Sequence, residues 1–593
     1  MNPNPDNQSQ TGAATSISIA MAGSGGSGVM TAGNLLLDAA AKAGLYGLMV
    51  RTSGPQIRGG EAAALLRLAR TQTESLDDGF DLLLAIDWQN VPRFNDEIPL
   101  RSDSCIVGDS DEGEVPAAFA ASGARCLALA MKKQAKGIKG CWPNMLALGV
   151  AGGLAGLPLA ALEAALRDSW KRGEDALAAN RKALQAGYEQ GSGLGHLKGA
   201  EGLQAAGGGK SRWLISGNEA AGLGAIRGGV RFVAAYPITP ATELLEWMAP
   251  ALVKVGGSLL QAEDELASVN MIIGASYGGV PSLTATAGPG LALMTEALGL
   301  AVTAEVPIVV VDVMRGGPST GIPAKSEQSD LSYAVNGLHG DAPRLVLAPN
   351  SIADCLRTTQ WAVHLAEALQ APAVVLSDQF MGQSRAIIDR PADPGLRAER
   401  LVAAAHTPDF KRYLDTPSGV SPMAVPGTPG TVYTAAGLEH TEAGIPSSQA
   451  RDHRVQLAKR QRKLDLHDYG SAWADIDGDG ELAVITFGST TGATREAVAR
   501  ARAAGHRVRL ISIRLLAPAR PEHMERALEG VKRVLVVEQN HSAQLLRYLR
   551  SVYDLPSRPL SFHRPGPLPL RPGELAEAIA AAAPTPSTVL EAA

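Results

Sequence analysis

The chain has 593 residues, too many for one hydrophobic core, so we expect three or four domains. Its residues are 45% hydrophobic but only 4% aromatic, and 65 are glycine, a composition typical of α/β layers joined by tight turns. A formal net charge of −5 gives no reason to expect nucleic acid or an anionic membrane as a partner. The first residues lack a signal-peptide pattern and no apolar run approaches about 20 residues, so we expect a cytoplasmic protein.

The first structured segment contains a glycine-rich loop. A strand over residues 16–21 leads into Gly23-Ser-Gly-Gly-Ser-Gly28 and a helix over 29–43, which is the G-x-G-x-x-G pattern of dinucleotide sites. Such a site also needs an acid closing the second strand, but residues 47–50 are followed by Arg51. We favour a phosphate cradle of another kind and keep an NAD(P)-dependent dehydrogenase as an alternative.

The four cysteines are scattered along the chain, and no two form a Cys-x-x-Cys pair: Cys105, Cys126, Cys141 and Cys355. Iron–sulfur clusters and structural zinc sites draw on closely spaced thiolates. We therefore expect neither in this chain. If it serves a redox enzyme, the electron carrier is expected on another polypeptide.

Beyond a glycine-rich stretch at 191–210, strands and helices alternate, which predicts a parallel, doubly wound sheet. The clearest helices are 263–277 and 291–303, and the expected strands are 213–216, 231–235, 258–262, 282–286, 307–313 and 344–347. After residues 231–235 comes a stiff loop, Tyr-Pro-Ile-Thr-Pro, and then a helix. We expect Thr239 as its N-cap and Pro240 as its first residue, with free amides facing a small anion.

The alternation stops at about residue 400 and returns at 482. The segment between is rich in Pro, Gly and Ser and then basic at 451–463, where we expect an exposed helix lying across a neighbour. Asp475, Asp477 and Asp479 imitate the first half of a calcium loop, but its twelfth position is Thr486 and a strand follows. A turn rich in Asp before a strand is enough to explain these three residues without calcium.

Four segments together resemble the α subunits of the 2-oxoacid:ferredoxin oxidoreductases. They are YPITP at 236–240, QAEDELA at 261–267, TATAGPG at 284–290 and RGGPSTGIPAKSEQSD at 315–330, in matching order and spacing. The stretch SGPQIRGGE at 53–61 resembles the separate γ domain of these enzymes, here fused in front.

The resemblance implies three α/β domains: a γ-type domain near coenzyme A, a doubly wound parallel sheet of the thiamine diphosphate pyrimidine-binding type, and a transketolase-C-like domain. With the composition it predicts a disordered leader at 1–15, the γ domain at 16–190, a linker at 191–210, the pyrimidine domain at 211–400, an irregular basic connection at 401–480, the C-terminal domain at 481–582 and a tail at 583–593.

In this family thiamine diphosphate lies between two chains. Gly478-Asp-Gly480 imitates the start of the magnesium motif, but no Asn occurs between residues 481 and 539, so the resemblance assigns Mg²⁺ and a [4Fe–4S] cluster to a β subunit. This chain would cover the aminopyrimidine through Glu265, with Glu263 as second choice. Three acids that merely complement a helix dipole are the alternative.

The resemblance also implies the remaining site residues. Tyr236, Thr239 and Arg315 would bind the substrate, with Thr239 and Arg315 also acting in catalysis, and Lys325 would bind a distal carboxylate. Arg315 could instead pair with an acid such as Glu327. The cofactor contacts would come from Gly288, Pro289, Gly290, Ser53, Gly54 and Arg58, with Arg58 as a solvated surface arginine the alternative.

The implied reaction is oxidative decarboxylation of 2-oxoglutarate with coenzyme A, giving succinyl-CoA and reducing ferredoxin, in an (αβ)₂ heterotetramer. Pyruvate or indolepyruvate is the competing substrate within the family. Besides the dehydrogenase, a scaffold subunit without catalytic residues stays open, because this chain lacks the cluster and the diphosphate motif.

Overall fold

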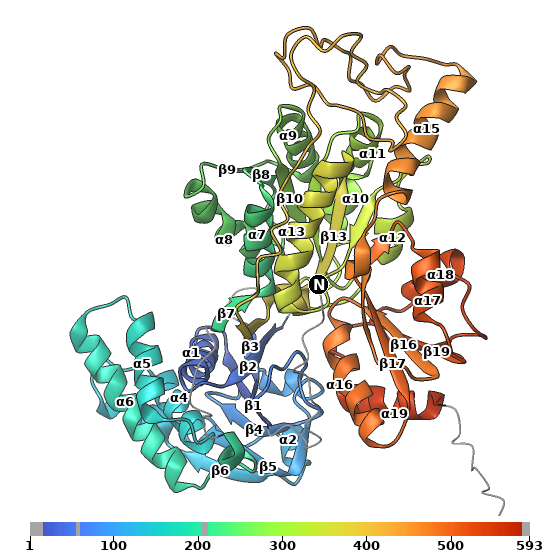
Figure 1. Cartoon of the computed structure of the whole chain (residues 1–593). Helices are drawn as coiled ribbons and strands as arrows, with labels where there is room; N and C mark the ends of the chain where they lie inside the picture. The colour runs from blue at the N-terminus through green and yellow to red at the C-terminus, as the bar shows by residue number, and fades with distance from the viewer. Residues whose placement is uncertain (1–15, 55–59, 204–211, 584–593) are drawn as a thin grey trace, which may run out of the picture.

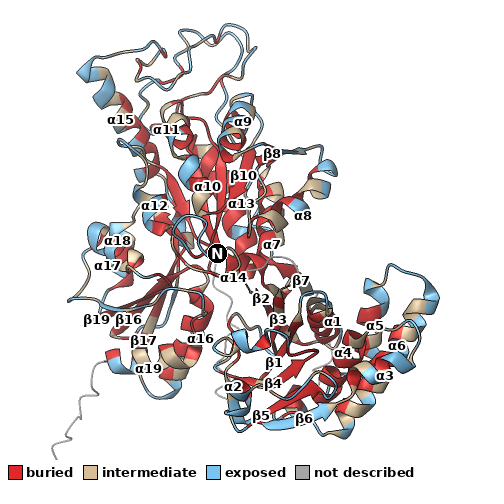
Figure 2. Ribbon diagram, turned by 180° about the vertical axis from the view of Figure 1, so that it is seen from behind, coloured by how far each residue is buried: buried red, intermediate tan, exposed pale blue. Residues whose placement is uncertain are grey.

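The computed structural model describes residues 16–54, 60–203 and 212–583, which form three α/β bodies around three sheets (Figure 1). The expected leader lies outside these residues, as do residues 584–593 of the expected tail. Buried residues line both faces of the sheets, with exposed residues on the outer helices (Figure 2). Within the described ranges, no helix is both long and apolar enough to cross a membrane.

The N-terminal sheet has the strand order β6-β5-β4-β1-β3-β2-β14-β7. Its strands are β1 (Ser16–Ser24), β2 (Tyr46–Ser53), β3 (Glu61–Ala69), β4 (Phe80–Ala85), β5 (Leu100–Asp109), β6 (Arg125–Leu129), β7 (Arg212–Ser216) and β14 (Arg385–Asp389). Its helices are α1 (Val29–Lys42), α2 (Ala117–Ala120), α3 (Met131–Gly137), α4 (Pro143–Leu154), α5 (Leu159–Ser169) and α6 (Glu174–Gly193), with short 3₁₀ turns η1 (Val91–Phe94) and η2 (Ala200–Leu203). Because β3 lies antiparallel between β1 and β2, the sheet does not have the strand order of a dinucleotide-binding fold.

Strands β7 and β14 come from the segment expected to form the second domain, yet they complete the N-terminal sheet. They pair antiparallel with each other, and β14 pairs antiparallel with β2. The strand expected at 213–216 therefore forms, but not in the second sheet. Alternating hydrophobicity predicts a strand without saying which sheet it joins, since that depends on contacts far apart in sequence.

The middle sheet has the order β18-β12-β13-β11-β10-β8-β9 and is parallel except for β18, an antiparallel edge strand from the C-terminal body. Its strands are β8 (Phe232–Ala235), β9 (Ser258–Gln261), β10 (Ser282–Thr286), β11 (Val309–Met314), β12 (Leu345–Leu347), β13 (Ala373–Asp378) and β18 (Leu515–Ala517). Its helices are α7 (Gly217–Gly228), α8 (Thr242–Val253), α9 (Glu265–Tyr277), α10 (Gly288–Leu293), α11 (Thr295–Thr303), α12 (Leu331–Asn336), α13 (Ile352–Leu369) and α14 (Gln379–Gln383). The expected helix at 291–303 is thus divided at Met294.

The helix after Tyr236 starts later than expected. Its N-cap is Ala241 and its first residue is Thr242, whereas Thr239 and Pro240, joined by a cis peptide bond, belong to the loop. The carbonyl oxygen of Ile238 accepts hydrogen bonds from the amides of Ala241 and Thr242. This turn occupies the place where the first helical turn was expected, so the predicted N-cap role of Thr239 is wrong.

The C-terminal sheet has the order β15-β17-β16-β19-β20. Its strands are β15 (Ala474–Asp477), β16 (Leu482–Phe487), β17 (Val508–Ile513), β19 (Arg533–Glu538) and β20 (Leu560–His563), and its helices are α16 (Thr490–Ala503), α17 (Pro521–Ala527), α18 (Gln544–Val552) and α19 (Pro572–Ala582), with a 3₁₀ turn η3 (Gly470–Trp473) before β15. Asp475 and Asp477, part of the false calcium pattern, lie in β15 and pair with Arg514 and Arg502. This body starts at β15, ahead of the expected residue 481.

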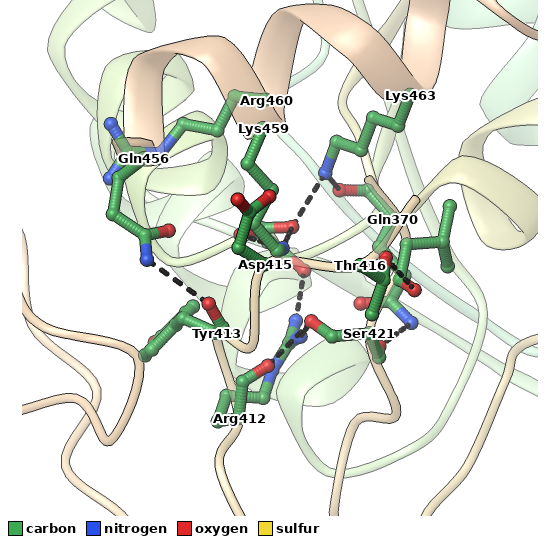
Figure 3. Close-up of polar contacts among 12 residues, drawn as sticks. Gln370, Arg412, Tyr413, Asp415, Thr416, Ser421, Gln456, Lys459, Arg460 and Lys463 are labelled. Atoms are coloured by element: carbon green, nitrogen blue, oxygen red, sulfur yellow. Dashed lines mark hydrogen bonds and ion pairs between the residues drawn. The ribbon is translucent and has the colours of Figure 1, made fainter. Parts of the chain in front are cut away.

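The segment 390–449 contains no named helix or strand and is seen at the top of Figure 1, so the irregular part begins and ends earlier than the connection expected at 401–480. The basic helix α15 (Ala450–Asp465) follows it, but its expected exposure is wrong on one face. Lys459 and Lys463 are buried there and point into the protein (Figure 3). A run of basic residues does not reveal that a buried acid elsewhere in the chain will neutralise part of it.

That acid is Glu305, which is 0% exposed after α11. Its carboxylate accepts hydrogen bonds from Lys459 at 2.6 and 2.7 Å and from Lys463 at 2.9 Å, and Arg412 donates to its main-chain carbonyl. Burial alone would raise the pKa of Glu305, but the three cations outweigh burial and hold that pKa well below its ordinary value. Burial lowers the pKa of Lys463 to about 7, against the opposing pull of Glu305. The cluster thus fastens α15 to the middle body.

We expect Glu305→Gln to lower the free energy of unfolding of the chain by about 3 kcal/mol or more, because two lysines lose their buried partner charge. Urea unfolding measures the change. Glu481→Gln is the matched control, since the Glu481–Lys532 pair is largely exposed and should contribute less than about 1 kcal/mol. Equal losses in the two variants would contradict a role for Glu305 in holding α15.

Candidate functional site

Three loops of the middle body meet at the carboxyl ends of neighbouring parallel strands. Residues 236–241 follow β8, residues 287–290 follow β10, and residues 315–330 follow β11. Because β8, β10 and β11 are adjacent and parallel, the sheet brings these loops to one edge. This is the edge at which doubly wound sheets bind their ligands.

Glu265 is the buried acid of the trio at the start of α9. Its residue is 6% exposed, whereas Glu263 is exposed and Asp264 caps the helix by accepting a hydrogen bond from the amide of Ala267. No donor among the described residues binds the Glu265 carboxylate. The helix-dipole alternative explains Asp264, but it does not explain why the neighbouring residue Glu265 is buried.

The glycine turn after β10 lies directly against this carboxylate. A Cβ atom built on Gly290 would stand 2.7 Å from Oε1 of Glu265 and 2.0 Å from Oγ1 of Thr286, so only glycine fits. Gly288 and Pro289 open α10, and their residues are half-buried. The turn therefore shapes one wall beside Glu265.

Arg315 is 6% exposed, and its Nη1 donates to the main-chain carbonyl oxygen of Thr239. The structure thus brings these two predicted site residues together. Glu327 does not pair with Arg315, because its carboxylate accepts from the amide of Gly566. Burial lowers the pKa of Arg315, with Asp330 opposing. Nε of Arg315 is buried with no partner among the described residues, so the guanidinium retains donors for an anion.

Lys325 lies at the boundary with the N-terminal body. Its ammonium donates to Oε1 of Glu97 at 2.5 Å and to the hydroxyl of Thr52, above the ring of Phe94. The loop after β11 is therefore tied to the N-terminal body. A role for Lys325 toward a distal carboxylate stays a prediction, in which the ligand competes with Glu97.

Tyr236 is 41% exposed at the end of β8, so its ring is open to a partner or ligand. Ser53 ends β2, and Gly54 packs against the Glu61 carboxylate, which Arg93 binds at 3.0 Å. Arg58 lies outside the described residues. The predicted coenzyme contacts Ser53 and Gly54 thus lie near Glu61, a carboxylate that Arg93 already pairs with.

The loop 23–28 is already occupied by protein groups. The Asp87 carboxylate accepts hydrogen bonds from the amide of Ser24 at 3.0 Å and from its hydroxyl at 2.8 Å. A Cβ atom on Gly28 would meet the Asn144 side chain at 2.3 Å. A carboxylate at the first loop amide repels phosphate, so this loop favours neither the phosphate cradle nor the dinucleotide alternative.

Sequence reasoning missed two acids beside this site, Asp312 and Asp330. Asp312 stands inside the apolar strand VVVDVM of β11 and is 0% exposed, and Asp330 is the residue just before the short helix α12, without a capping hydrogen bond from its side chain. A charged residue within an otherwise apolar strand is the signal that could have drawn attention to Asp312.

Three families match this chain in succession. Residues 18–190 match pyruvate ferredoxin/flavodoxin oxidoreductase, residues 223–460 match pyruvate flavodoxin/ferredoxin oxidoreductase, thiamine diP-binding, and residues 480–555 match pyruvate:ferredoxin oxidoreductase core domain II. A 2-oxoglutarate synthase subunit KorA from Methanothermobacter marburgensis is 37% identical over 334 residues, 55% of this chain and 88% of that subunit.

Other relatives match over smaller shares of their own length. The 2-oxoglutarate oxidoreductase subunit KorA of Mycobacterium tuberculosis is 35% identical over 69% of this chain and 64% of its own, and a 2-oxoacid:ferredoxin oxidoreductase subunit alpha of Saccharolobus solfataricus is 36% identical over 56% and 55%. Among solved structures, the 2-oxoglutarate:ferredoxin oxidoreductase from Magnetococcus marinus, with 2-oxoglutarate, coenzyme A and succinyl-CoA bound, has a TM-score of 0.86 and 36% identity over 95% of this chain and 99% of that one.

We expect Glu265→Gln to raise the free energy of unfolding of the chain by about 1 kcal/mol, because an amide costs less to bury than a carboxylate without a donor. Urea unfolding of the chain alone measures this change. Glu263→Gln, the same substitution at an exposed position two residues away, should change stability by less than about 0.5 kcal/mol. A destabilised Glu265→Gln variant would mean that the carboxylate has a stabilising partner.

Proposed function

Because the chain belongs to the 2-oxoacid:ferredoxin oxidoreductase family, we propose that it is the α-type subunit of an enzyme that oxidatively decarboxylates 2-oxoglutarate. The observation that carries the proposal is that two buried residues of opposite charge, Glu265 and Arg315, belong to segments at the same edge of the middle sheet. Glu265 is a buried residue whose carboxylate accepts no hydrogen bond from a described residue, and Nε of the buried Arg315 has no partner among those residues. Such groups cost free energy unless a ligand completes them.

The proposed reaction converts 2-oxoglutarate and coenzyme A into succinyl-CoA, CO₂, one proton and two electrons, which pass to ferredoxin. The bond between the carboxylate carbon and the carbonyl carbon breaks, and a thioester bond forms at the carbonyl carbon. Thiamine diphosphate, when bound, supplies the carbanion chemistry that this cleavage needs.

The residues at the sheet edge fit the aminopyrimidine half of that cofactor. The Glu265 carboxylate would accept a hydrogen bond from ring nitrogen N1′ in its protonated form, and the absence of a side chain at Gly290 lets the glycine turn pack directly against this carboxylate. In a site shielded from water, such a hydrogen bond is stronger than in solution. Gly288, Pro289 and Gly290 would form the wall against the ring.

Arg315 and the loop at Thr239 would hold the substrate. A guanidinium presents two parallel N–H groups to a carboxylate, and the Thr239 carbonyl fixes one end of it. The Thr239 hydroxyl would be a further donor to the substrate. Tyr236, exposed at the mouth, would cover the substrate together with the partner chain.

A partner must supply what this chain's sequence lacks. We propose a β subunit that binds the diphosphate, Mg²⁺ and a [4Fe–4S] cluster, assembled with this chain as an (αβ)₂ heterotetramer that reduces ferredoxin. The segment 16–190 would act as the γ part near coenzyme A, with Ser53, Gly54 and Arg58 as contacts. Four unpaired cysteines fit a reducing compartment such as the cytoplasm.

The direct experiment is co-expression of the chain with its partner and assay of viologen or ferredoxin reduction that depends on 2-oxoglutarate and coenzyme A. Glu265→Gln should lower kcat by a factor of about 10² or more while the complex still assembles, a loss typical of acid–base partners. Glu263→Gln is the control. Activity within threefold of wild type in Glu265→Gln would favour a scaffold role for this chain.

Arg315 and Lys325 are expected to differ in how they affect substrate selectivity. We expect Arg315→Lys to raise KM for 2-oxoglutarate, pyruvate and 2-oxobutyrate alike, by about tenfold or more, because a point charge cannot replace the planar fork. Lys325→Met should impair 2-oxoglutarate more than the other two, since only that substrate has a distal carboxylate. Steady-state kinetics on all three substrates measures both. Equal losses from Lys325→Met would assign the distal carboxylate to the partner chain.

A further inference from the structure

The acids Asp312 and Asp330 form a buried carboxyl pair behind the proposed substrate site. Asp312 lies on β11, with Thr286 of β10 and Leu376 of β13 as its register partners. Asp330 comes from the loop that starts at Arg315 and ends at α12. The two side chains are in direct contact.

The pair has too few hydrogen-bond donors for two charges. Both carboxylate oxygens of Asp312 lack a donor among the described residues, and so does Oδ2 of Asp330. Oδ1 of Asp330 accepts from the Ser329 hydroxyl at 3.0 Å. Two carboxylates in contact away from water cannot both stay ionised, because neither charge is solvated and the two repel each other.

The pair touches both parts of the site. A Cβ atom on Gly288 would lie 2.6 Å from Oδ1 of Asp330, so this carboxyl packs against the backbone of the glycine turn. The Ser329 hydroxyl lies within hydrogen-bond distance of both Asp330 and the main-chain oxygen of Arg315, the latter at 2.8 Å. Asp330 and Ser329 together thus connect the turn at 288–290 with the substrate arginine.

We propose that Asp312 and Asp330 share a single proton and act as a positioning pair, which holds the 288–290 turn beside Arg315 and sets how strongly Arg315 attracts an anionic substrate. The attraction changes because the charge on the pair changes. A pair with two protons is neutral and leaves the charge of Arg315 uncompensated, whereas a pair with one proton carries one negative charge. The role of Arg315 in this inference rests on the proposed function, whereas the shared proton does not.

The charged groups around the pair define the pH at which this change occurs. Arg315 attracts the Asp330 charge and Glu327 repels it, while Asp378 at the end of β13 caps α14 and Glu265 faces Gly290. Burial raises the pKa of Asp330 to about 6, and burial with the repulsion of Asp330 raises that of Asp312 well above its ordinary value. The pair therefore gains its charge as the pH rises through about 6, within a range accessible to kinetics.

The kinetic test uses the assembled complex between pH 5.5 and 8. In wild type, KM for 2-oxoglutarate should rise by roughly three- to tenfold as the pair becomes charged and compensates Arg315. Asp330→Asn should remove this rise and keep KM at its low-pH value, because Asp312 then stays protonated. Asp312→Asn should retain the rise, because burial, the largest cause of the raised pKa of Asp330, remains in this variant. Asp341→Asn, at an exposed position of the same body, should behave as wild type.

A merely structural pair would lower kcat or assembly and leave the pH dependence of KM intact in both variants, and that result would overturn the proposal. A wild-type KM that does not change across this pH range would overturn it too. A wild-type complex without any 2-oxoacid activity would instead refute the proposed function.

A second measurement needs no activity. Because the folded chain holds the Asp330 proton more tightly than the unfolded chain does, the stabilisation is complete below about pH 4 and is lost as the pH rises through about 6. The melting temperature of Asp330→Asn relative to wild type should therefore rise by roughly 2 to 4 °C between pH 5 and pH 7.5. A constant difference over this range would mean that no shared proton is present.

Discussion

The contact between the Glu265 carboxylate and the glycine turn at 288–290 is the constraint on which the proposed site depends. A side chain at Gly290 would fill the space that Glu265 and Thr286 occupy, so the turn can approach α9 only without one. That approach places a carboxylate at the carboxyl edge of the sheet with no donor from its own chain. The chain thus presents a prepared acceptor that another molecule must complete.

The middle body contains several buried charged groups, and only some of them are neutralised by an ion pair. Glu305 is neutralised by Lys459 and Lys463 and fastens an irregular segment to the sheet. Arg315 and Glu265 form no ion pair among the described residues, and Asp312 and Asp330 face each other. The first cluster contributes structure. The unneutralised groups lie together at one sheet edge, which is the distribution expected of a ligand site, where unfavourable burial is retained for binding.

The sequence predicts the parts of this protein whose signals are local. Strands such as β16 and β19 follow short apolar runs, and the buried position of Glu265 follows the family motif. Long-range features were missed: β7 and β14 join a sheet formed mainly by residues 16–129, and the basic face of α15 is buried by Glu305, about 150 positions earlier. The start of α8 was misplaced because Ile238 forms its own turn first. Lys325 was expected at the substrate, and its ion pair with Glu97 requires knowledge of how two bodies pack.

Calorimetric titration of thiamine diphosphate with Mg²⁺ tests most directly whether this chain supplies only the pyrimidine side of a shared site. The titration is made into the chain alone, into the partner subunit alone and into their complex. The account predicts tight, saturable binding by the complex and affinity weaker by about 10²-fold or more for the chain alone, because the proposed diphosphate and metal contacts lie on the partner. Binding to the isolated chain as tight as to the complex would contradict it.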